Sequence, residues 1–295
     1  HNAVRTACGM FDVSHMGEVI VRGPDAIRFV SSVTSNDVEA LAIGQVQYST
    51  LLRADGTIVD DLLVYRFADH LMLVINASNR DKDLAHLRAH IAGFECTMTD
   101  ISDSIALLAV QGPQAPALVA SLSDVPLDGI KYYWFTEGQV AGVPCIISRT
   151  GYTGELGFEL YFDASHAVAV WNAVMAAGAV TPAGLGCRDS LRLEAGMCLY
   201  GNELDDRTTP IEAGLTWAVK LKSGLPFKGL DALTAQLESG MKKRLATFSV
   251  ADPEVILLGR ETIYRNGERV GWLSSGGFGH WVGHPIGLGY VRRAG

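Results

Sequence analysis

The stretch 149–159 constrains this chain more than any other, because its glycines force a turn that leads directly into a strand. From Gly157 onward the side chains alternate, so Phe158 and Glu159 are expected to face opposite sides of that strand. Glu159 then lies between an aromatic residue and a glycine, which leaves room for a flat ring. Its carboxylate can accept two parallel N–H bonds, as a pterin or guanine edge offers. The alternative is an ordinary turn with Glu159 in solvent.

Length and composition describe an ordinary globular protein. The chain has 295 residues, of which 48% are hydrophobic and 19% charged, enough for two or three domains. A net charge of −8 argues against nucleic acid or a membrane surface as the main partner, but it permits a small anionic ligand. Five scattered cysteines form no Cys-x-x-Cys pair, so we expect no metal site. No apolar run approaches the roughly 18 residues that span a bilayer.

Strand and helix patterns alternate along the chain without a strict rhythm. The predicted strands are 18–21, 47–52, 58–67, 71–75, 105–110, 139–148 and 158–162, and the predicted helices are 24–33, 78–92, 115–122, 164–177 and 188–196. After Pro226 the segments become charged and hairpin-like, with Asn266-Gly267 as a two-residue turn. This pattern predicts an α+β body with a small C-terminal β-barrel or sandwich.

The segment 76–84 predicts a helix that starts after a buried strand. Ser78 and Asp81 have the spacing of a capping box, and Asp83 falls in or just after the first turn, where the helix dipole favours a carboxylate. An aspartate fixed there can act as a base or hold an amine. The alternative is a helix-start acid with a structural role only.

The segment 186–194 concentrates charge on another predicted helix. Arg188 and Arg192 lie four residues apart and share one face, while Asp189 and Glu194 can pair with them. Arg188 lies near the helix start, where the dipole disfavours a cation. It is therefore a candidate for binding a carboxylate or for a specific ion pair, and a structural salt bridge is the alternative.

Taken together, several stretches resemble the T-protein of the glycine cleavage system, the folate-dependent aminomethyltransferase family. The matching stretches are 11–18, 34–37, 44–49, 56–66, 76–84, 151–159, 188–196 and 199–202. The likeness extends over almost the whole chain and keeps the order of the motifs.

The resemblance implies an α+β fold with three domains around a central tetrahydrofolate cavity. The implied domains are a folate-binding unit of 1–45 with 128–225, a second α+β unit of 46–127 that carries Asp83, and a C-terminal β-barrel of 226–295. The implied activity is transfer of the aminomethyl group on the lipoyl arm of the H-protein, which yields ammonia and 5,10-methylenetetrahydrofolate. Such an enzyme is expected in the cytoplasm, or in the mitochondrial matrix of a eukaryote.

The resemblance also assigns roles to single residues. By position, Glu159 resembles the glutamate that clamps the pterin, and Tyr152 a neighbour that packs against the ring. Arg188 matches the arginine of the folate site, and Asp83 the aspartate beside the nitrogens that receive the one-carbon unit. Met16 is expected to wall the cavity. Attack by a folate nitrogen on a methylene carbon needs a held geometry and a carboxylate near the developing positive charge.

Two departures from the family pattern keep other interpretations open. The chain ends soon after 289–291, short of the family's usual last strands and of a further C-terminal arginine. The stretches 258–261 and 271–276 are closer to the folate-binding tails of sarcosine- and dimethylglycine-type demethylating flavoproteins. One alternative is therefore such a tail, and another is a folate-binding module without transferase activity.

Overall fold

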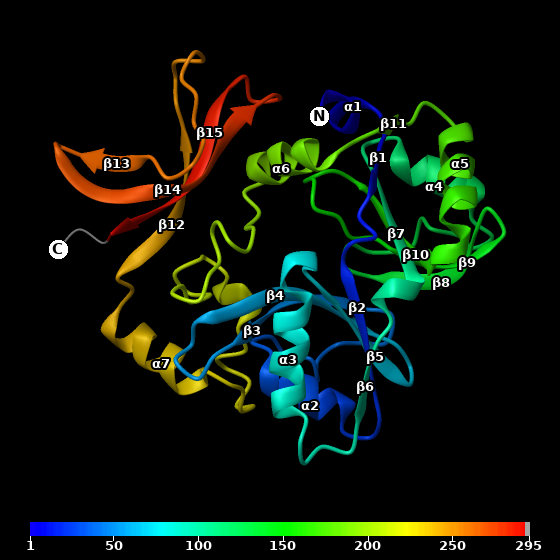
Figure 1. Ribbon diagram of the computed structural model, residues 1–295, viewed down its shortest axis with the longest axis horizontal. Coiled ribbons are helices and arrows are strands. Elements are labelled where there is room, and N and C mark those ends of the chain that lie inside the picture. Colours follow the sequence, from blue (N-terminus) through cyan, green and yellow to red (C-terminus); the bar gives the residue numbers. More distant parts are fainter. Residues whose placement is uncertain (293–295) are drawn as a thin grey trace.

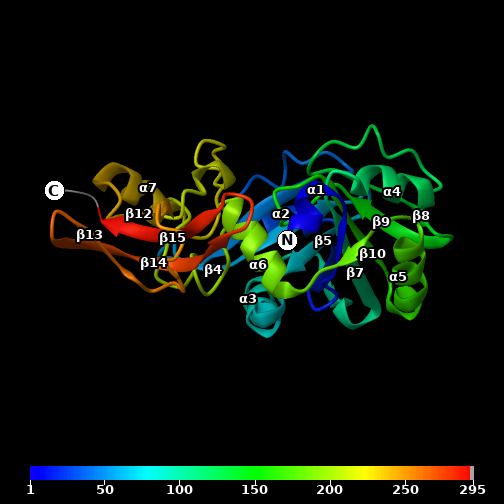
Figure 2. The ribbon, with the colours of Figure 1, turned by 90° about the horizontal axis from the view of Figure 1, so that it is seen from above.

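The protein, in a computed structural model that describes residues 1–292, is built on three sheets. Two sheets form a body with their helices, and the third, made of C-terminal strands, stands at one end of the elongated molecule (Figures 1 and 2). The predicted α+β class with a small C-terminal sheet domain is confirmed. The helices are α1 (Asn2–Thr6), α2 (Ala26–Val33), α3 (Arg80–His90), α4 (Ala115–Leu122), α5 (Ala167–Ala176), α6 (Leu185–Glu194) and α7 (Leu230–Ser239), with 3-10 turns η1 (Ala77–Asn79), η2 (Ser102–Ser104), η3 (Ala164–His166) and η4 (Thr216–Ala218).

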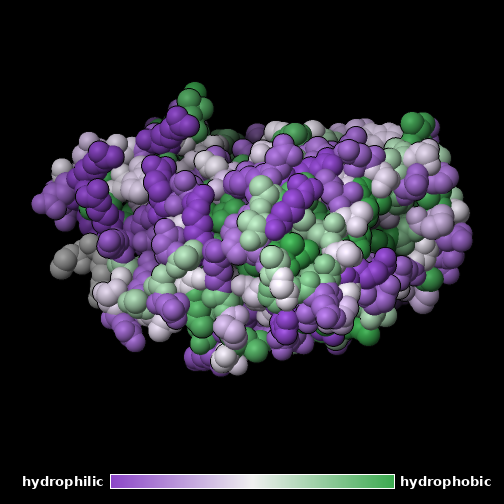
Figure 3. Space-filling model, turned by 60° about the horizontal axis from the view of Figure 1, so that its bottom comes forward, coloured by the Kyte–Doolittle hydropathy of each residue, from purple (hydrophilic) through white to green (hydrophobic). Residues whose placement is uncertain are grey.

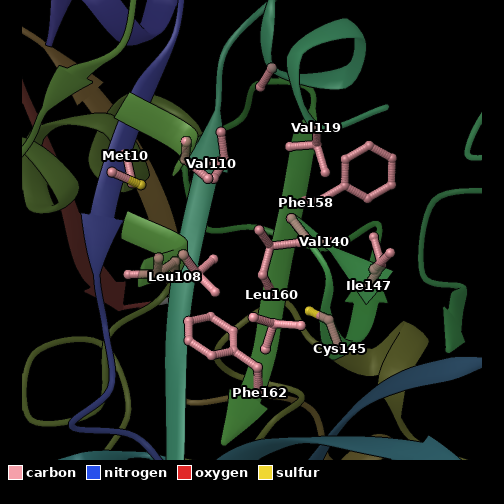
Figure 4. Packing of buried hydrophobic residues seen from close by; sticks show 14 of the residues in the cluster. Met10, Leu108, Val110, Val119, Val140, Cys145, Ile147, Phe158, Leu160 and Phe162 are labelled. Carbon is pink, nitrogen blue, oxygen red and sulfur yellow. The ribbon is translucent and has the colours of Figure 1, made fainter. Parts of the chain in front are cut away.

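The first sheet has the strand order β11-β1-β7-β10-β9-β8. Its strands are β1 (Gly9–Asp12), β7 (Ile105–Gln111), β8 (Phe135–Val140), β9 (Val143–Ser148), β10 (Gly157–Asp163) and β11 (Thr181–Pro182). Phe158, Leu160 and Phe162 of β10 lie in one core with residues of α4 and α5, as Figure 4 shows for Val119 of α4. The alternation predicted for this strand is confirmed, and it turns Glu159 and Tyr161 toward the opposite face.

The second sheet has the order β3-β4-β5-β2-β6. Its strands are β2 (Gly17–Arg22), β3 (Val46–Leu52), β4 (Ile58–Arg66), β5 (His70–Ile75) and β6 (Thr97–Asp100). Helices α2 and α3 cover one face, where Phe29 and Leu87 are fully buried. The other face packs against the first sheet through a shared core, to which the second sheet gives Tyr65 and Met72 and the first gives Leu107 and Tyr161.

Strand pairing divides the chain at different points from the predicted domain boundaries. Strand β2 falls within 1–45 but pairs with β5, Glu18 opposite Val74, in the sheet of the predicted second domain. Strand β7 falls within 46–127 but lies between β1 and β10 of the other sheet. These pairings join segments that are distant in sequence, and local patterns of hydrophobicity carry no signal for them.

The C-terminal sheet is antiparallel, in the order β12-β15-β14-β13. Its strands are β12 (Lys243–Ser249), β13 (Thr262–Arg265), β14 (Glu268–Gly279) and β15 (His284–Arg292). Asn266 and Gly267 both adopt positive φ, 53° and 83°, and link β13 to β14 as predicted. Helix α7, which precedes this sheet, was not predicted from the sequence.

An ion pair without exposed surface ties this sheet to the body. Arg192 of α6 donates to Glu203 Oε2 at 2.8 Å and to Ser275 Oγ of β14 at 2.9 Å, and both charged side chains are 0% exposed. Asp189 completes the network with a hydrogen bond of 2.8 Å from Arg192 Nε. Arg192 therefore forms a structural salt bridge. Arg188 on the same helix lies outside this network.

The surface mixes hydrophilic residues with smaller hydrophobic patches on the face in Figure 3. Within residues 1–292 no helix combines the length and the apolar character needed to cross a bilayer. The same residues contain no group of three His, Cys, Asp or Glu side chains arranged to hold a metal ion.

Candidate functional site

The predicted glycine-rich turn forms between β9 and β10. Gly154 has φ +75°, a conformation that side-chain-bearing residues rarely adopt. A Cβ on Gly151 would collide with the side-chain amide of Gln111, a residue of β7. Gln111 Nε2 donates to the carbonyl of Thr150 at 3.1 Å, so the turn is fastened to the sheet directly beside β10.

Glu159 lies on the predicted face of β10 and is 6% exposed. The Thr150 hydroxyl donates to its Oε2 at 2.6 Å. Thr150 in turn belongs to a buried hydroxyl cluster with Ser148, Tyr65 and Tyr161, in which the two tyrosine oxygens lie 2.9 Å apart. Among the described residues, Glu159 Oε1 accepts no hydrogen bond. One oxygen therefore fixes the carboxylate, and the other is open to a ligand.

Arg188 and Tyr152 lie beside this open oxygen. Arg188 Nη2 is 4.0 Å from Glu159 Oε1, and the guanidinium carbon is 4.9 Å from the centre of the Tyr152 ring. The Tyr152 hydroxyl donates to the carbonyl of Cys198, which fixes the ring. Arg188 Nη1 is buried and has no hydrogen-bond partner in the described part of the chain. The structure thus brings together Glu159, Arg188 and Tyr152, all of which were predicted as site residues. Among the described residues, Glu159 Oε1 and Arg188 Nη1 have no hydrogen-bond partner and are available to a ligand.

Met16 follows β1 in the loop that leads to the second sheet. Its side chain is partly buried and packs against the core shared by the two sheets, which also includes Tyr161 and Cys187. This is the face of β10 that carries Glu159. The role of Met16 as a wall of the cavity stays a prediction.

Asp83 lies in the first turn of α3, as expected. It is 0% exposed. Burial first, and then Asp60, raise the pKa of Asp83 far above its usual range. Its role beside the folate nitrogens stays a prediction. The capping box is wrong, since no side chain caps this helix.

Asp61 of β4 is a partly exposed residue. Its Oδ1 accepts from Asn76 Nδ2 at 2.9 Å, and its Oδ2 accepts from the Tyr48 hydroxyl at 3.1 Å. Burial first, and then the neighbouring Asp60, raise the pKa of Asp61 to about 7. Sequence reasoning missed Asp61, although a signal was present: two acids interrupt an apolar strand, and alternation sends them to opposite faces.

The Tyr48 ring, which is bonded to Asp61 through its hydroxyl, belongs to a group of aromatic residues. The Tyr48 ring stacks on the exposed ring of Trp217 with centres 5.5 Å apart. Tyr48, Tyr133 and Trp217 line a cavity of about 250 Å³. Sequence reasoning did not single out any of these three residues.

The backbone of Tyr133 joins the start of β3 to the glycine-rich turn: its carbonyl accepts from Val46 N at 2.8 Å, and its N–H donates to the Arg149 carbonyl at 3.1 Å. Its φ of 62° is rare for a residue other than glycine, and such backbone strain clusters at functional sites. Burial raises the pKa of Tyr133, and Tyr132, Glu159, Tyr65 and Asp61 act in the same direction. A second cavity of about 230 Å³, lined by Tyr132 and by the turn that holds Thr150, adjoins the Glu159 end.

Comparisons with known proteins agree with this architecture. Residues 1–223 match the family described as the GCVT N-terminal domain, and 243–295 match the glycine cleavage T-protein C-terminal barrel domain. The chain is 46% identical over 298 residues to an aminomethyltransferase of Chloroherpeton thalassium, covering 100% of this chain and 82% of that protein. It is 44% identical over 295 residues to an aminomethyltransferase of Desulfitobacterium hafniense, covering 99% and 80%.

A solved structure extends this agreement to three dimensions. The crystal structure of the glycine cleavage system aminomethyltransferase T from Bartonella henselae superimposes with a TM-score of 0.92 at 38% identity, over 99% of this chain and 80% of that one. Fold and relatives together define a transferase. The chain belongs to the aminomethyltransferase family of the glycine cleavage T-protein. The flavoprotein-tail alternative is not favoured, because the similarity to aminomethyltransferases extends over the whole chain.

Proposed function

We propose that this protein transfers the one-carbon unit of an aminomethyl group, carried on the lipoyl arm of the H-protein, to tetrahydrofolate, with release of ammonia. The observation that carries the proposal is the cluster of Glu159, Arg188 and Tyr152. Glu159 is anchored with one free oxygen beside Arg188, and Asp61 is partly exposed beside Tyr48. The cytoplasm stays the predicted location.

The Glu159 end suits the pterin. Two parallel N–H donors on the edge of a heterocycle match a carboxylate, whose oxygens each have two lone pairs. The hydrogen bond from Thr150 fixes the plane of that carboxylate before a ligand arrives. The free Nη1 of Arg188 is available to an acceptor on the same ligand. Tyr152, stacked under Arg188, supplies an apolar face, and Met16 is proposed to close the wall.

The Asp61 end suits the one-carbon chemistry. In the overall reaction the methylene carbon loses its bonds to sulfur and to the amino nitrogen and gains bonds to two folate nitrogens, each of which loses its N–H proton. The two protons leave on ammonia and on the lipoyl thiol. A carboxyl group whose pKa is about 7 can take up and return a proton at neutral pH, and in its ionised form it stabilises positive charge near the carbon. We therefore propose Asp61 as a second carboxylate of the reaction, while Asp83 keeps the role that the family resemblance suggested.

Two measurements on one preparation test this function. Calorimetric titration with tetrahydrofolate reports binding, and ammonia release from aminomethylated H-protein reports turnover. We expect both, and we expect turnover to require tetrahydrofolate. Binding without turnover would favour a folate-binding module, and absence of both would overturn the proposal.

A further inference from the structure

Gln111, the last residue of β7, is a buried amide enclosed by the glycine-rich turn. It is 0% exposed, and it lies directly opposite Gly157 in the antiparallel pairing with β10. Opposite residues of such a pair share a face, so Gln111 lies on the face of β10 that carries Glu159, whose own opposite residue is Ala109. A glycine and an alanine at these two positions leave room for two long polar side chains on one face.

The Gln111 amide spends its donors and its acceptor on the turn. Nε2 donates to the carbonyl of Thr150 at 3.1 Å and, at 3.4 Å, to that of Phe158. Oε1 accepts from the Thr153 hydroxyl at 2.8 Å, and that hydroxyl accepts from the N–H of Glu155 at 3.2 Å. Because carbonyl oxygens only accept, the amide atom that faces them must be Nε2, which fixes the orientation of the amide. One side chain therefore holds several points of the turn.

Two glycines of the turn make room for this amide. A Cβ on Gly151 would collide with Gln111 Oε1, and a Cβ on Gly157 would lie 2.8 Å from Nε2. The φ of Gly151 is not positive, so its backbone alone does not require glycine. Position 151 therefore needs a glycine because of the Gln111 side chain.

The Gln111 amide acts on Glu159 through Thr150. Gln111 holds the main chain of Thr150, and the hydroxyl of the same residue donates to Glu159 Oε2 at 2.6 Å. If the Thr150 carbonyl lost its donor, the turn would be free to shift, and the hydroxyl would shift with it. The Glu159 carboxylate would then lose the contact that sets its plane.

We propose that Gln111 is a positioning residue for ligand binding: through Thr150 it holds the Glu159 carboxylate in the plane that accepts the pterin edge. The effect on affinity rests on the proposed function, in which Glu159 binds tetrahydrofolate. The order that Gln111 imposes on the turn does not, so the two can be tested separately.

Amide hydrogen exchange without ligand tests the order of the turn. Gln111→Met keeps the length of the side chain but removes the amide. We expect the Glu155 N–H, which donates to Thr153, to exchange at least about 10-fold faster in this variant, while the amides of β5 keep their rates. Gln114→Met is the matched control, because Gln114 is an exposed glutamine three residues further on, and it should leave both rates unchanged. Unchanged exchange at Glu155 in Gln111→Met, or equal acceleration in β5, would overturn the proposal.

Calorimetric titration with tetrahydrofolate tests the link to Glu159. We expect Gln111→Met to raise the Kd about 10-fold and Gln114→Met to leave it within about 3-fold. Added to Glu159→Gln, Gln111→Met should raise the Kd less than about 3-fold further, because it acts through the same carboxylate. A full further 10-fold loss in the double variant would overturn the proposal, since Gln111 would then act by a route independent of Glu159.

Gly151→Ala tests the same role without replacing Gln111 or Glu159, and it decides should Gln111→Met not fold. The added methyl group must push the Gln111 amide aside, so the Kd should rise about 10-fold. In the Gln111→Ala background the same substitution should change the Kd less than about 3-fold, because the space is then free. Equal losses in both backgrounds, or no loss in the first, would overturn the proposal. Absence of tetrahydrofolate binding by the unmodified protein would instead count against the proposed function, and the exchange result would then decide on Gln111.

Discussion

Arg188 Nη2 stands 4.0 Å from Glu159 Oε1, too far for a hydrogen bond and close enough for strong attraction. The arginine comes from α6 and the glutamate from β10, so the fold and not a local motif sets this gap. A molecule that donates to the carboxylate and accepts from the guanidinium fits between them. Such a group satisfies both charges without moving either element.

Replacing Glu159 should weaken the binding of tetrahydrofolate. Glu159→Gln exchanges a charged acceptor pair for an amide with one acceptor, and we expect the Kd to rise about 10- to 100-fold in a calorimetric titration. Glu155→Gln is the control, because Glu155 lies in the same turn but pairs with Arg5 at 3.0 Å. Equal weakening in both variants would contradict the clamp role of Glu159.

Replacing Asp61 should stop turnover and spare binding. Asp61→Asn preserves shape but removes the proton acceptor, so kcat for ammonia release should fall about 10²- to 10⁴-fold while the Kd for tetrahydrofolate stays within about 3-fold. Asp55→Asn, in the exposed turn that precedes β4, should behave like the unmodified protein. Near-normal kcat in Asp61→Asn would rule out the assigned role.

The pH dependence of kcat/KM should show the titration of Asp61. Its pKa is raised to about 7, first by burial. Since the ionised form is the active one, the rate should rise as pH increases through about 7 and then level off. A stopped-flow or steady-state series over pH 5 to 9 measures it. A rate that falls across the same range would show that Asp61 acts as an acid.

The stability of Asp83→Asn should depend on pH less than that of the unmodified protein. Burial raises the pKa of Asp83 in the folded state, so folding takes up a proton once the unfolded aspartate is ionised, above about pH 4. The free energy of unfolding of the unmodified protein therefore falls, relative to the variant, by up to about 1.4 kcal/mol per pH unit between that pH and the folded-state pKa. Urea titrations of both proteins at pH 4, 6 and 8 measure the difference, and parallel curves would contradict it.

Breaking the buried ion pair between α6 and the C-terminal sheet should cost stability. Arg192→Met leaves Glu203 charged and without its partner in a site with no exposed surface, so we expect a loss of about 3–5 kcal/mol. The double variant with Glu203→Leu should recover most of it, because no unpaired charge remains. Arg207→Met, at an exposed pair with Asp205, is the control and should leave the urea midpoint unchanged. An unchanged urea midpoint in Arg192→Met would show that this ion pair does not stabilise the folded protein.

The sequence correctly predicted those features of the fold that depend on interactions between neighbouring residues. The alternation of β10 and the Asn266-Gly267 turn depend on neighbouring residues only, and both are confirmed. The burial of the acids depends instead on how α3 packs on β4. That packing leaves Asp60 and Asp83 without exposed surface, whereas Asp61 stays partly exposed. No pattern within 58–67 or 76–84 states that these two segments meet.

The core shared by the two large sheets limits how this protein could have arisen from smaller pieces. Tyr65 and Met72 from one sheet are buried by Leu107 and Tyr161 from the other. The chain crosses from the first sheet to the second after β1 and returns before β7. A cut between β2 and β6 therefore leaves both products with incomplete sheets and an uncovered apolar face. A primitive ancestor with only one of these sheets would have needed another partner for that face, such as a second copy of itself.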